Sequence, residues 1–351
     1  MRILAILAGL IVLVVILLLA LPAPIDPVAW EPDPDPGLTG DFAENDRLAS
    51  VQRLLEGEGN GPEDVACAAD GTYFTGYHDG RIVRFTDDGK VTEVTNTGGR
   101  PLGMQFDESG RLIVADAMKG LLAVTMDGSI EVLSDSVNGQ RMLFVDDLDI
   151  AADGTIWFSD ASARHDYHHN ILDFLEGRSS GRLLSYDPSR GITKVHMENL
   201  FFANGVALGP DDAYVLVNET GAGRIQRLWL KGQRAGETEP FVSGLPGVPD
   251  NLSFNGSDTF WVAMPALRSG IDVMASKPRL RKLLSHLPVK TLASSIERYS
   301  FVVGLDTQGK VVHNLQDTAA GFNNITSVNE CNGSLYIGSL SMPAVARYPL
   351  P

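Results

Sequence analysis

The chain repeats one pattern six times, and this repetition constrains the fold more than any other feature. The pattern is an apolar strand, a turn containing DG or a variant of it, a second strand rich in aromatic and β-branched residues, and a third strand. The copies begin near residues 63, 102, 146, 203, 250 and 325. Each copy has the size of a four-stranded propeller blade, whereas the strands of a sandwich have no reason to repeat in fours. We therefore predict an all-β, six-bladed propeller over residues 46–351.

The segment RLASVQRLLEG at residues 47–57 resembles a strand but belongs to none of the six copies. We expect it to pair with the last copy and close the ring, which leaves no long free sheet edge.

The starts of the six first strands should converge on the propeller axis. Four of these six positions carry carboxylates or carboxamides, an all-oxygen set that suits Ca²⁺ because this cation accepts six to eight oxygen ligands without strict geometry. The alternative is that Asp and Asn only form turns at the strand starts. Asp64 and Asp147 are assigned to turns or to support of the ligands. The residues expected to bind the metal are Glu63, Asp146, Asn204, Asp250 and Asn251.

Several segments resemble, in order, those of the family that joins strictosidine synthase, the paraoxonases and the gluconolactonase/regucalcin group. They include GPEDV, GRPLGM, VDDL, FSDAS, GRLLSYD, FANGV, PGVPDN and NGSLYIGSL, and they run from about residue 50 to the C-terminus. The likeness is greatest to the adipocyte plasma membrane-associated branch. The resemblance implies a six-bladed propeller and places the same five residues at the family's calcium positions. Asp146 stands where related patterns have Asn.

The resemblance extends less completely to the catalytic residues of the family. Leu102 stands where the paraoxonase pattern has a catalytic histidine, and Thr326 stands where strictosidine synthase has a glutamate, so a strictosidine-type condensation is disfavoured. We expect instead a calcium-dependent hydrolase of esters or lactones, similar to arylesterases, in which the metal polarises a carbonyl and water attacks. The alternative is a non-catalytic binding propeller with a structural calcium. The general base is expected to be Asp147 or, next, His165, with His78, His168 and His169 as further candidates.

The N-terminus predicts attachment to a membrane. Residues 1–23 contain Arg2 and then an apolar run long enough to span a bilayer as a helix, and a cleaved signal peptide is the rival interpretation. With Arg2 on the cytoplasmic side, the propeller would lie in the periplasm, a lumen or the exterior. Residues 24–45 alternate Pro with Asp and Glu, which is typical of a stiff, solvated linker.

Charge and cysteine content add three expectations. The net charge of −16 argues against a nucleic-acid partner. The insertion at 265–299 is basic and has leucines at helical spacing, so it forms either a packed helix or a lid that contacts anionic lipid and admits lipophilic esters. Cys67 and Cys331 occupy matching places in the first and last copies, and whether they reach bonding distance stays open.

Overall fold

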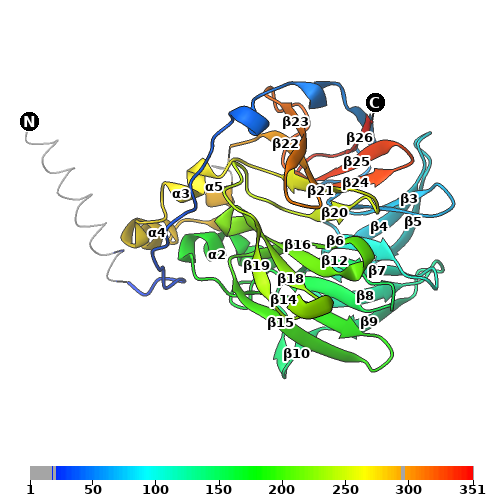
Figure 1. The fold of residues 1–351 in the computed structure, drawn as a ribbon, viewed down its shortest axis with the longest axis horizontal. Coiled ribbons are helices and arrows are strands. Elements are labelled where there is room, and N and C mark those ends of the chain that lie inside the picture. Colours follow the sequence, from blue (N-terminus) through cyan, green and yellow to red (C-terminus); the bar gives the residue numbers. More distant parts are fainter. Residues whose placement is uncertain (1–17, 19–20, 294–296, 351) are drawn as a thin grey trace, which may run out of the picture.

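The computed structural model describes residues 18, 21–293 and 297–350, and these form a ring of six four-stranded antiparallel blades (Figure 1). Blades 1 to 3 contain, in chain order, β2 (Val65–Cys67), β3 (Tyr73–Gly76), β4 (Arg81–Phe85) and β5 (Val91–Asn96); β6 (Pro101–Phe106), β7 (Leu112–Asp116), β8 (Gly120–Val124) and β9 (Ile130–Ser134); and β12 (Val145–Ile150), β13 (Ile156–Asp160), β14 (Gly181–Asp187) and β15 (Ile192–Leu200). A short hairpin, β10 (Ser136–Val137) and β11 (Gln140–Arg141), follows blade 2.

Blades 4 and 5 complete the repeats with four strands each, and blade 6 contributes three strands of its own. They are β16 (Ala203–Leu208), β17 (Tyr214–Glu219), β18 (Arg224–Trp229) and β19 (Thr238–Val242); β20 (Leu252–Phe254), β21 (Thr259–Met264), β22 (Ser300–Asp306) and β23 (Val311–Asp317); and β24 (Ile325–Cys331), β25 (Ser334–Ser339) and β26 (Val345–Pro349). The first strands β2, β6, β12, β16, β20 and β24 contact one another in a closed ring around the axis. The all-β, six-bladed fold is thus confirmed.

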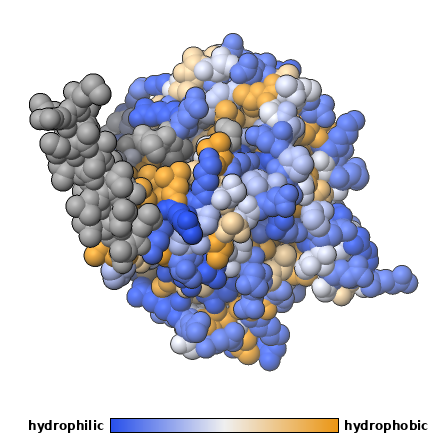
Figure 2. Space-filling view, turned by 90° about the vertical axis from the view of Figure 1, so that its left-hand side faces the viewer, coloured by the Kyte–Doolittle hydropathy of each residue, from blue (hydrophilic) through white to orange (hydrophobic). Residues whose placement is uncertain are grey.

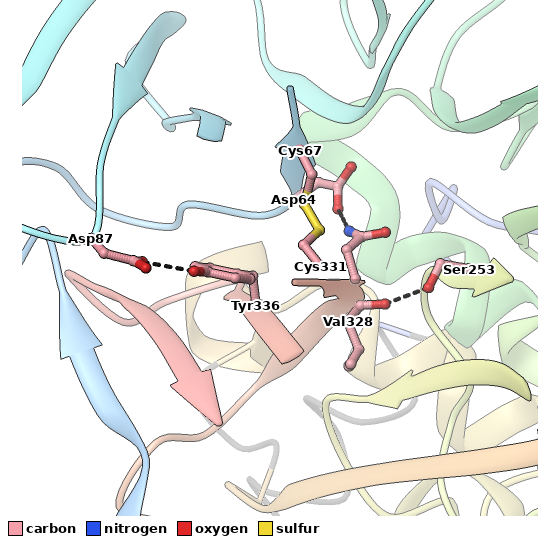
Figure 3. The surroundings of a disulfide bond; sticks show 8 residues. Asp64, Cys67, Asp87, Ser253, Val328, Cys331 and Tyr336 are labelled. Atoms are coloured by element: carbon pink, nitrogen blue, oxygen red, sulfur yellow. Dashed lines mark hydrogen bonds between the residues drawn. A yellow bond between two sulfur atoms is a disulfide. The ribbon is translucent and has the colours of Figure 1, made fainter. Parts of the chain in front are cut away.

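The ring closes as expected from the sequence. Strand β1 (Gln52–Leu54) pairs antiparallel with β26, with Gln52 opposite Arg347, and so supplies the fourth strand of blade 6. A disulfide between Cys67 and Cys331 joins the innermost strands β2 and β24 of the first and last blades, across a Cα–Cα distance of 6.5 Å (Figure 3). The question that the sequence left open is settled in favour of the bond.

The hairpins follow from their turn residues. Gly71 and Gly110 have φ values of 82° and 81°, a left-handed conformation that glycine adopts without steric cost. The carboxylate of Asp107 accepts the N–H groups of Ser109 and Arg111 and so fixes the turn between β6 and β7. Apolar residues of adjacent blades pack face to face, as Phe158 of blade 3 does against Ile113 and Leu121 of blade 2.

The two long insertions form a cap on one side of the ring (Figure 1). The first contains η3 (Tyr167–His169) and α2 (Asn170–Glu176); the second contains α3 (Ser269–Asp272), α4 (Pro278–Leu284) and α5 (Val289–Ala293). Helix α2 contacts both α4 and α5. The remaining short 3₁₀ turns are η1 (Gly40–Phe42), η2 (Arg47–Ser50), η4 (Pro210–Asp212), η5 (Thr220–Ala222) and η6 (Gly232–Arg234).

Residues 25–30 pack on this cap and residues 38–45 pack against blade 5, so the segment 24–45 is not the solvated linker that the sequence predicted. Val28 N–H donates to the Glu176 carbonyl at 2.9 Å, and Ile25 is buried against Leu172 and Leu175 of α2. The guanidinium of Arg281 stacks on the Trp30 ring at 4.4 Å. The expected membrane helix at residues 1–23 falls mostly outside the described residues. Among the helices that are described, none is long and apolar enough to cross a bilayer.

Candidate metal and active site

The five residues expected to bind metal lie at or just before the innermost strands. All are buried, with exposed fractions of 2–9%; they are Glu63, Asp146, Asn204, Asp250 and Asn251. Gly205 lets the chains approach here, because a Cβ at this position would come within 2.5 Å of the Asp250 carbonyl oxygen. The Gly205 N–H donates to that same oxygen at 3.0 Å. The local sequence Asn-Gly therefore brings the side chain of Asn204 up against blade 5.

Three carboxylates share this small buried space. Burial raises the pKa of Glu63 to about 7, and Arg100 acts in the opposite direction. Burial also raises the pKa of Asp146 well above its usual range, and the charges of Glu63 and Asp250 raise it further. The pKa of Asp250 rises for the same two causes, burial and then Glu63, while a hydrogen bond from Asn204 lowers it. The structure thus brings Glu63, Asp146, Asn204 and Asp250 together, as the sequence predicted.

Several oxygens of this group lack a hydrogen-bond partner. Buried Oδ1 atoms without a partner are present on Asn204, Asp250, Asn251 and the neighbouring Asn218, whose amide donates to the Asp250 carbonyl. An unsatisfied buried polar atom costs about 1–3 kcal/mol, so a cluster of them indicates a missing partner. Within the described ranges, no group of three or more His, Cys, Asp or Glu side chains could hold a metal ion. Carboxamide oxygens would therefore have to complete any cation site, and the unpartnered atoms belong mainly to carboxamides.

The sequence analysis missed Arg100, which is fully buried beside the cluster. Its Nη2 lies 3.2 Å from Glu63 Oε2, its Nη1 donates to the Gly61 carbonyl at 2.9 Å, and it hydrogen-bonds to Tyr167 of the cap. Arg100 lies one residue before β6, in the segment GGRPLGM. The sequence signal was a charged residue directly before β6, whose aligned start at Leu102 is apolar where other copies have acidic or amide residues.

A lower layer of carboxylates lies deeper in the channel. Asp64 Oδ2 accepts the Met104 N–H at 2.9 Å, and Asp147 Oδ2 accepts the Val206 N–H at 2.8 Å. Two further N–H groups, from Leu148 and Leu252, also bond to Asp147. Apart from the one from Leu148, these bonds tie each blade to its neighbour. Both carboxylates line a channel cavity of about 220 Å³ together with Asn251 and Ser327.

The proposed histidines have other partners. His165 Nε2 lies 2.8 Å from Glu176 Oε2, in a cap network that also includes Arg164. His169 pairs with Asp166, and His78 Nε2 bonds to the Leu340 carbonyl at 2.8 Å. Burial, followed by the charge of Arg100, lowers the pKa of His78 to about 4. Of these rings, His78 is therefore the one influenced by a residue of the site.

The two positions where the family's catalytic residues are absent have structural roles. Leu102 is buried in an apolar cluster with Phe144, Phe201 and Phe202, which Tyr167 and Trp30 of the cap extend. Thr326 Oγ1 donates to the Glu63 carbonyl at 2.8 Å and so helps to join blade 6 to blade 1. The site therefore has an apolar, aromatic wall on the blade 2 to blade 4 side.

Comparison with known proteins places this architecture in a family. Residues 146–233 match the strictosidine synthase family model, and residues 40–85 match the model of the strictosidine synthase-like N-terminal region. The adipocyte plasma membrane-associated protein of Rattus norvegicus is 33% identical, with 95% of each chain covered. Protein strictosidine synthase-like 6 of Arabidopsis thaliana is 35% identical, with 83% of this chain and 79% of the relative covered. The chain belongs to the strictosidine synthase-like family.

Solved structures show that this strictosidine synthase-like chain shares a wider propeller fold. A gluconolactonase from Xanthomonas campestris matches with a TM-score of 0.63 at 18% identity, over 94% of this chain and 99% of the other. A regucalcin from Agrobacterium tumefaciens, described as a calcium-binding protein, matches with a TM-score of 0.57 at 11% identity, over 85% and 96%. At such identities the likeness shows the fold alone.

Proposed function

We propose that the chain is a calcium-dependent hydrolase of esters or lactones, held on the non-cytoplasmic face of a membrane. The observation that carries the proposal is the set of buried, unpartnered oxygens on Asn204, Asp250 and Asn251 beside the carboxylates of Glu63 and Asp146. Hard oxygen donors of mixed charge fit Ca²⁺ better than a transition metal. The gluconolactonase fold and the calcium-binding regucalcin relative support this choice.

The residues of the site have separable roles. Glu63, Asp146, Asn204, Asp250 and Asn251 would hold the cation, which when bound would act as a Lewis acid on the substrate carbonyl. The aromatic wall of Phe144, Phe201 and Phe202 would exclude water and accept the apolar part of an ester. Arg100 and Tyr167 would keep Glu63 in place from the other side.

The surroundings favour Asp147 over His165 as the proton acceptor. His165 is engaged by Glu176, whereas Asp147 lines the channel cavity next to Asn251. Burial, followed by the charge of Asp64, raises the pKa of Asp147 well above its usual range. A raised pKa brings a carboxylate closer to the neutral range in which a general base is most effective.

The test is hydrolysis of phenyl acetate and a panel of lactones by the full chain in detergent, with Ca²⁺ and with chelator. We expect calcium-dependent turnover. Asp250→Ala should reduce it by about a hundredfold or more, because this variant removes a metal ligand. The control variant Asp135→Ala, at an exposed site, should retain the wild-type turnover. Asp147→Asn should lower kcat without changing calcium affinity. Turnover that is unaffected by both chelator and Asp250→Ala would contradict the proposal.

One observation favours a second candidate, a binding propeller with a structural calcium. The five ligand residues are nearly inaccessible to solvent, and the cap lies over this end of the molecule. In that case chelation would lower the melting temperature while no substrate in the panel is turned over. The two functions are thus distinguished by the same experiment.

We also propose that the cap faces the membrane. The apolar N-terminal run ends near Leu21, and Ile25 is already buried against α2, so only a short length of chain separates the proposed bilayer segment from the cap. The cap exposes Val273 (64%), Leu280 (41%) and Leu287 (43%). Figure 2 shows hydrophobic areas on this side of the molecule, among hydrophilic surface.

The charges of the cap fit anionic lipid only in part. Arg268 and Arg281 contribute to the basic character of the insertion at 265–299, but both are fully buried. Arg268 pairs with Asp272 at 2.9 Å, and Arg281 donates to the Leu175 carbonyl at 2.8 Å. Lys277, Arg279 and Lys290 remain exposed around the apolar side chains, an arrangement that anionic headgroups would attract.

The membrane-facing cap predicts lipid-dependent protection. In vesicles of mixed neutral and phosphatidylserine lipid, the full chain with cysteine introduced at Leu280 or Leu287 should react slowly with a water-soluble maleimide. A matched cysteine at Val132, exposed on β9 away from the cap, should react rapidly. Equal labelling of Leu280→Cys and Val132→Cys in vesicles would refute the orientation.

A further inference from the structure

Arg100 is held more rigidly than an ordinary ion-pair residue. It is fully buried, and its own backbone N–H donates to Asp116 Oδ1 at 3.0 Å while its carbonyl accepts the Ala117 N–H at 3.0 Å. Asp116 is the last residue of β7, so the second strand of blade 2 holds the backbone of Arg100, the residue directly before the first strand, β6. The guanidinium therefore enters the site from a rigid base.

The described hydrogen-bond partners of the guanidinium are oxygen atoms, and its Nε has no partner among the described residues. Its donors go to the Gly61 carbonyl and to Glu63 Oε2, its third contact is the Tyr167 hydroxyl, and its charge also acts on Asp146. A buried cation is costly unless anions compensate for it. When a cation is bound and all three groups are ionised, Glu63, Asp146 and Asp250 supply three negative charges, and Arg100 supplies one positive charge. Two negative charges remain, which one divalent cation would balance.

We propose that Arg100 is the built-in counter-cation of this ring and determines its preference for the charge of the bound ion. The inference rests on the metal site in the proposed function. Arg100 reduces the affinity of the ring for any cation, reduces it more for a trivalent than for a divalent ion, and keeps Glu63 paired when no metal is bound. Blade 2 thus contributes a positive charge where blades 1, 3 and 5 contribute carboxylates.

The consequence of removing this charge follows from Coulomb's law. Repulsion between Arg100 and a bound ion scales with the charge of the ion, so a gain of about tenfold for Ca²⁺ in Arg100→Gln implies a gain of about thirtyfold for Tb³⁺. The ratio of the two dissociation constants should therefore shift about threefold toward Tb³⁺. Without metal, Glu63 would be left as an unpaired buried carboxylate, and the variant should melt earlier in chelator than the wild type does.

The experiment measures Ca²⁺ binding by calorimetry and Tb³⁺ binding by sensitised luminescence on the full chain in detergent. Arg100→Lys keeps the charge and should keep the wild-type ratio. If Arg100→Gln does not fold, Glu63→Gln compared with the double variant Glu63→Gln/Arg100→Gln isolates the same charge, because both variants lack the Glu63 carboxylate. The double variant should again show the threefold shift relative to Glu63→Gln.

The outcomes separate this inference from the proposed function. Wild-type binding that Asp250→Ala abolishes, together with the ratio shift on loss of Arg100, supports both. Wild-type binding with an unchanged ratio in Arg100→Gln and in the double variant overturns the role of Arg100 and leaves the metal site standing. No calcium or terbium binding by the wild type overturns both.

Discussion

Two layers of carboxylates lie in the same channel, and they differ in what surrounds them. Glu63 and Asp146 belong to the upper layer and have a guanidinium, other carboxylates and carboxamides as neighbours. Asp64 and Asp147, the next residues in the chain, belong to the lower layer and accept backbone N–H groups from adjacent blades. The two members of each pair are adjacent in the chain but have different partners, so one residue step separates the two environments.

This difference indicates which acidic residues hold adjacent blades together and which have oxygens available to bind a cation. In the lower layer, Asp64 joins blade 1 to blade 2, Asp147 and Asp149 join blade 3 to blade 4, and Asn329 joins blade 6 to Asp64 of blade 1. These hydrogen bonds take the place of the ladder that adjacent blades lack. In the upper layer, Asp250 Oδ1 and the carboxamide oxygens of Asn204, Asn218 and Asn251 have no such partner.

The largest expected effect on stability comes from the neighbouring pair Asp146 and Asp147. Asp147→Ala leaves the Val206 and Leu252 N–H groups buried without an acceptor, and we expect the free energy of unfolding to fall by about 3–4 kcal/mol. In chelator, Asp146→Ala should cost less than about 1 kcal/mol or should stabilise, because it relieves repulsion from Glu63 and Asp250. Urea unfolding of both variants measures the difference.

The same pair gives the opposite order for metal binding. Asp146→Ala should weaken Ca²⁺ binding by about tenfold or more, whereas Asp147→Asn, which keeps an acceptor oxygen, should leave it nearly unchanged. If the two alanine variants lose equal stability in chelator, the division into two layers does not hold.

The ring closure offers a second, slightly smaller test. The disulfide between Cys67 and Cys331 spans 264 residues and lies beside the hydrogen bond between Asp64 and Asn329 (Figure 3). Replacing both cysteines by serine should lower the free energy of unfolding by about 2–4 kcal/mol. Guanidinium unfolding of the double variant should agree with that of the reduced wild type. A loss below about 1 kcal/mol would show that β1 pairing and the lower layer suffice to close the ring.

The sequence predicted the features that repeat and missed those that depend on contacts between distant segments. Six copies with glycine turns predicted the blades, and the aligned strand starts predicted that Glu63, Asp146, Asn204 and Asp250 lie close together. Arg100 was missed because it lies one residue outside the aligned strand. Its charge becomes meaningful only once blade 1 places Glu63 beside it.

The cap was harder to predict for a related reason. Pro and acidic residues in 24–45 are typical of solvated linkers, and the few apolar residues among them gave no periodic signal. Ile25, Val28 and Trp30 nevertheless contact α2 and the second insertion, 146 or more positions later in the chain. Arg281 likewise looked like surface charge, because its partners Val28 and Leu175 are carbonyls that no sequence pattern reveals.

The smallest expected effect is a pH dependence that arises in the lower layer. Burial raises the pKa of Asp149 to about 6, although the Leu208 N–H lowers it. The raised pKa means that Asp149 binds its proton more tightly in the folded state than in the unfolded state. Protonated Asp149 therefore contributes to the free energy of unfolding below pH of about 4, and this contribution is lost as pH rises through 6. Asp149 is half-buried in the structure, so we expect only about 1 kcal/mol across this window.

Asp149→Asn keeps an acceptor for the Leu208 N–H and removes the titration, so its unfolding free energy between pH 4 and 7 should be flatter than that of the wild type. Asp88→Asn is the control of opposite sign. The Thr86 hydroxyl lowers the pKa of Asp88, so that carboxylate contributes stability above its unfolded pKa and loses it as pH falls. Chemical unfolding at each pH distinguishes the slopes. Parallel curves for Asp149→Asn and the wild type would mean that this lower-layer carboxylate is as well solvated as a surface aspartate, and the contrast between the layers would then rest on hydrogen bonding and not on burial.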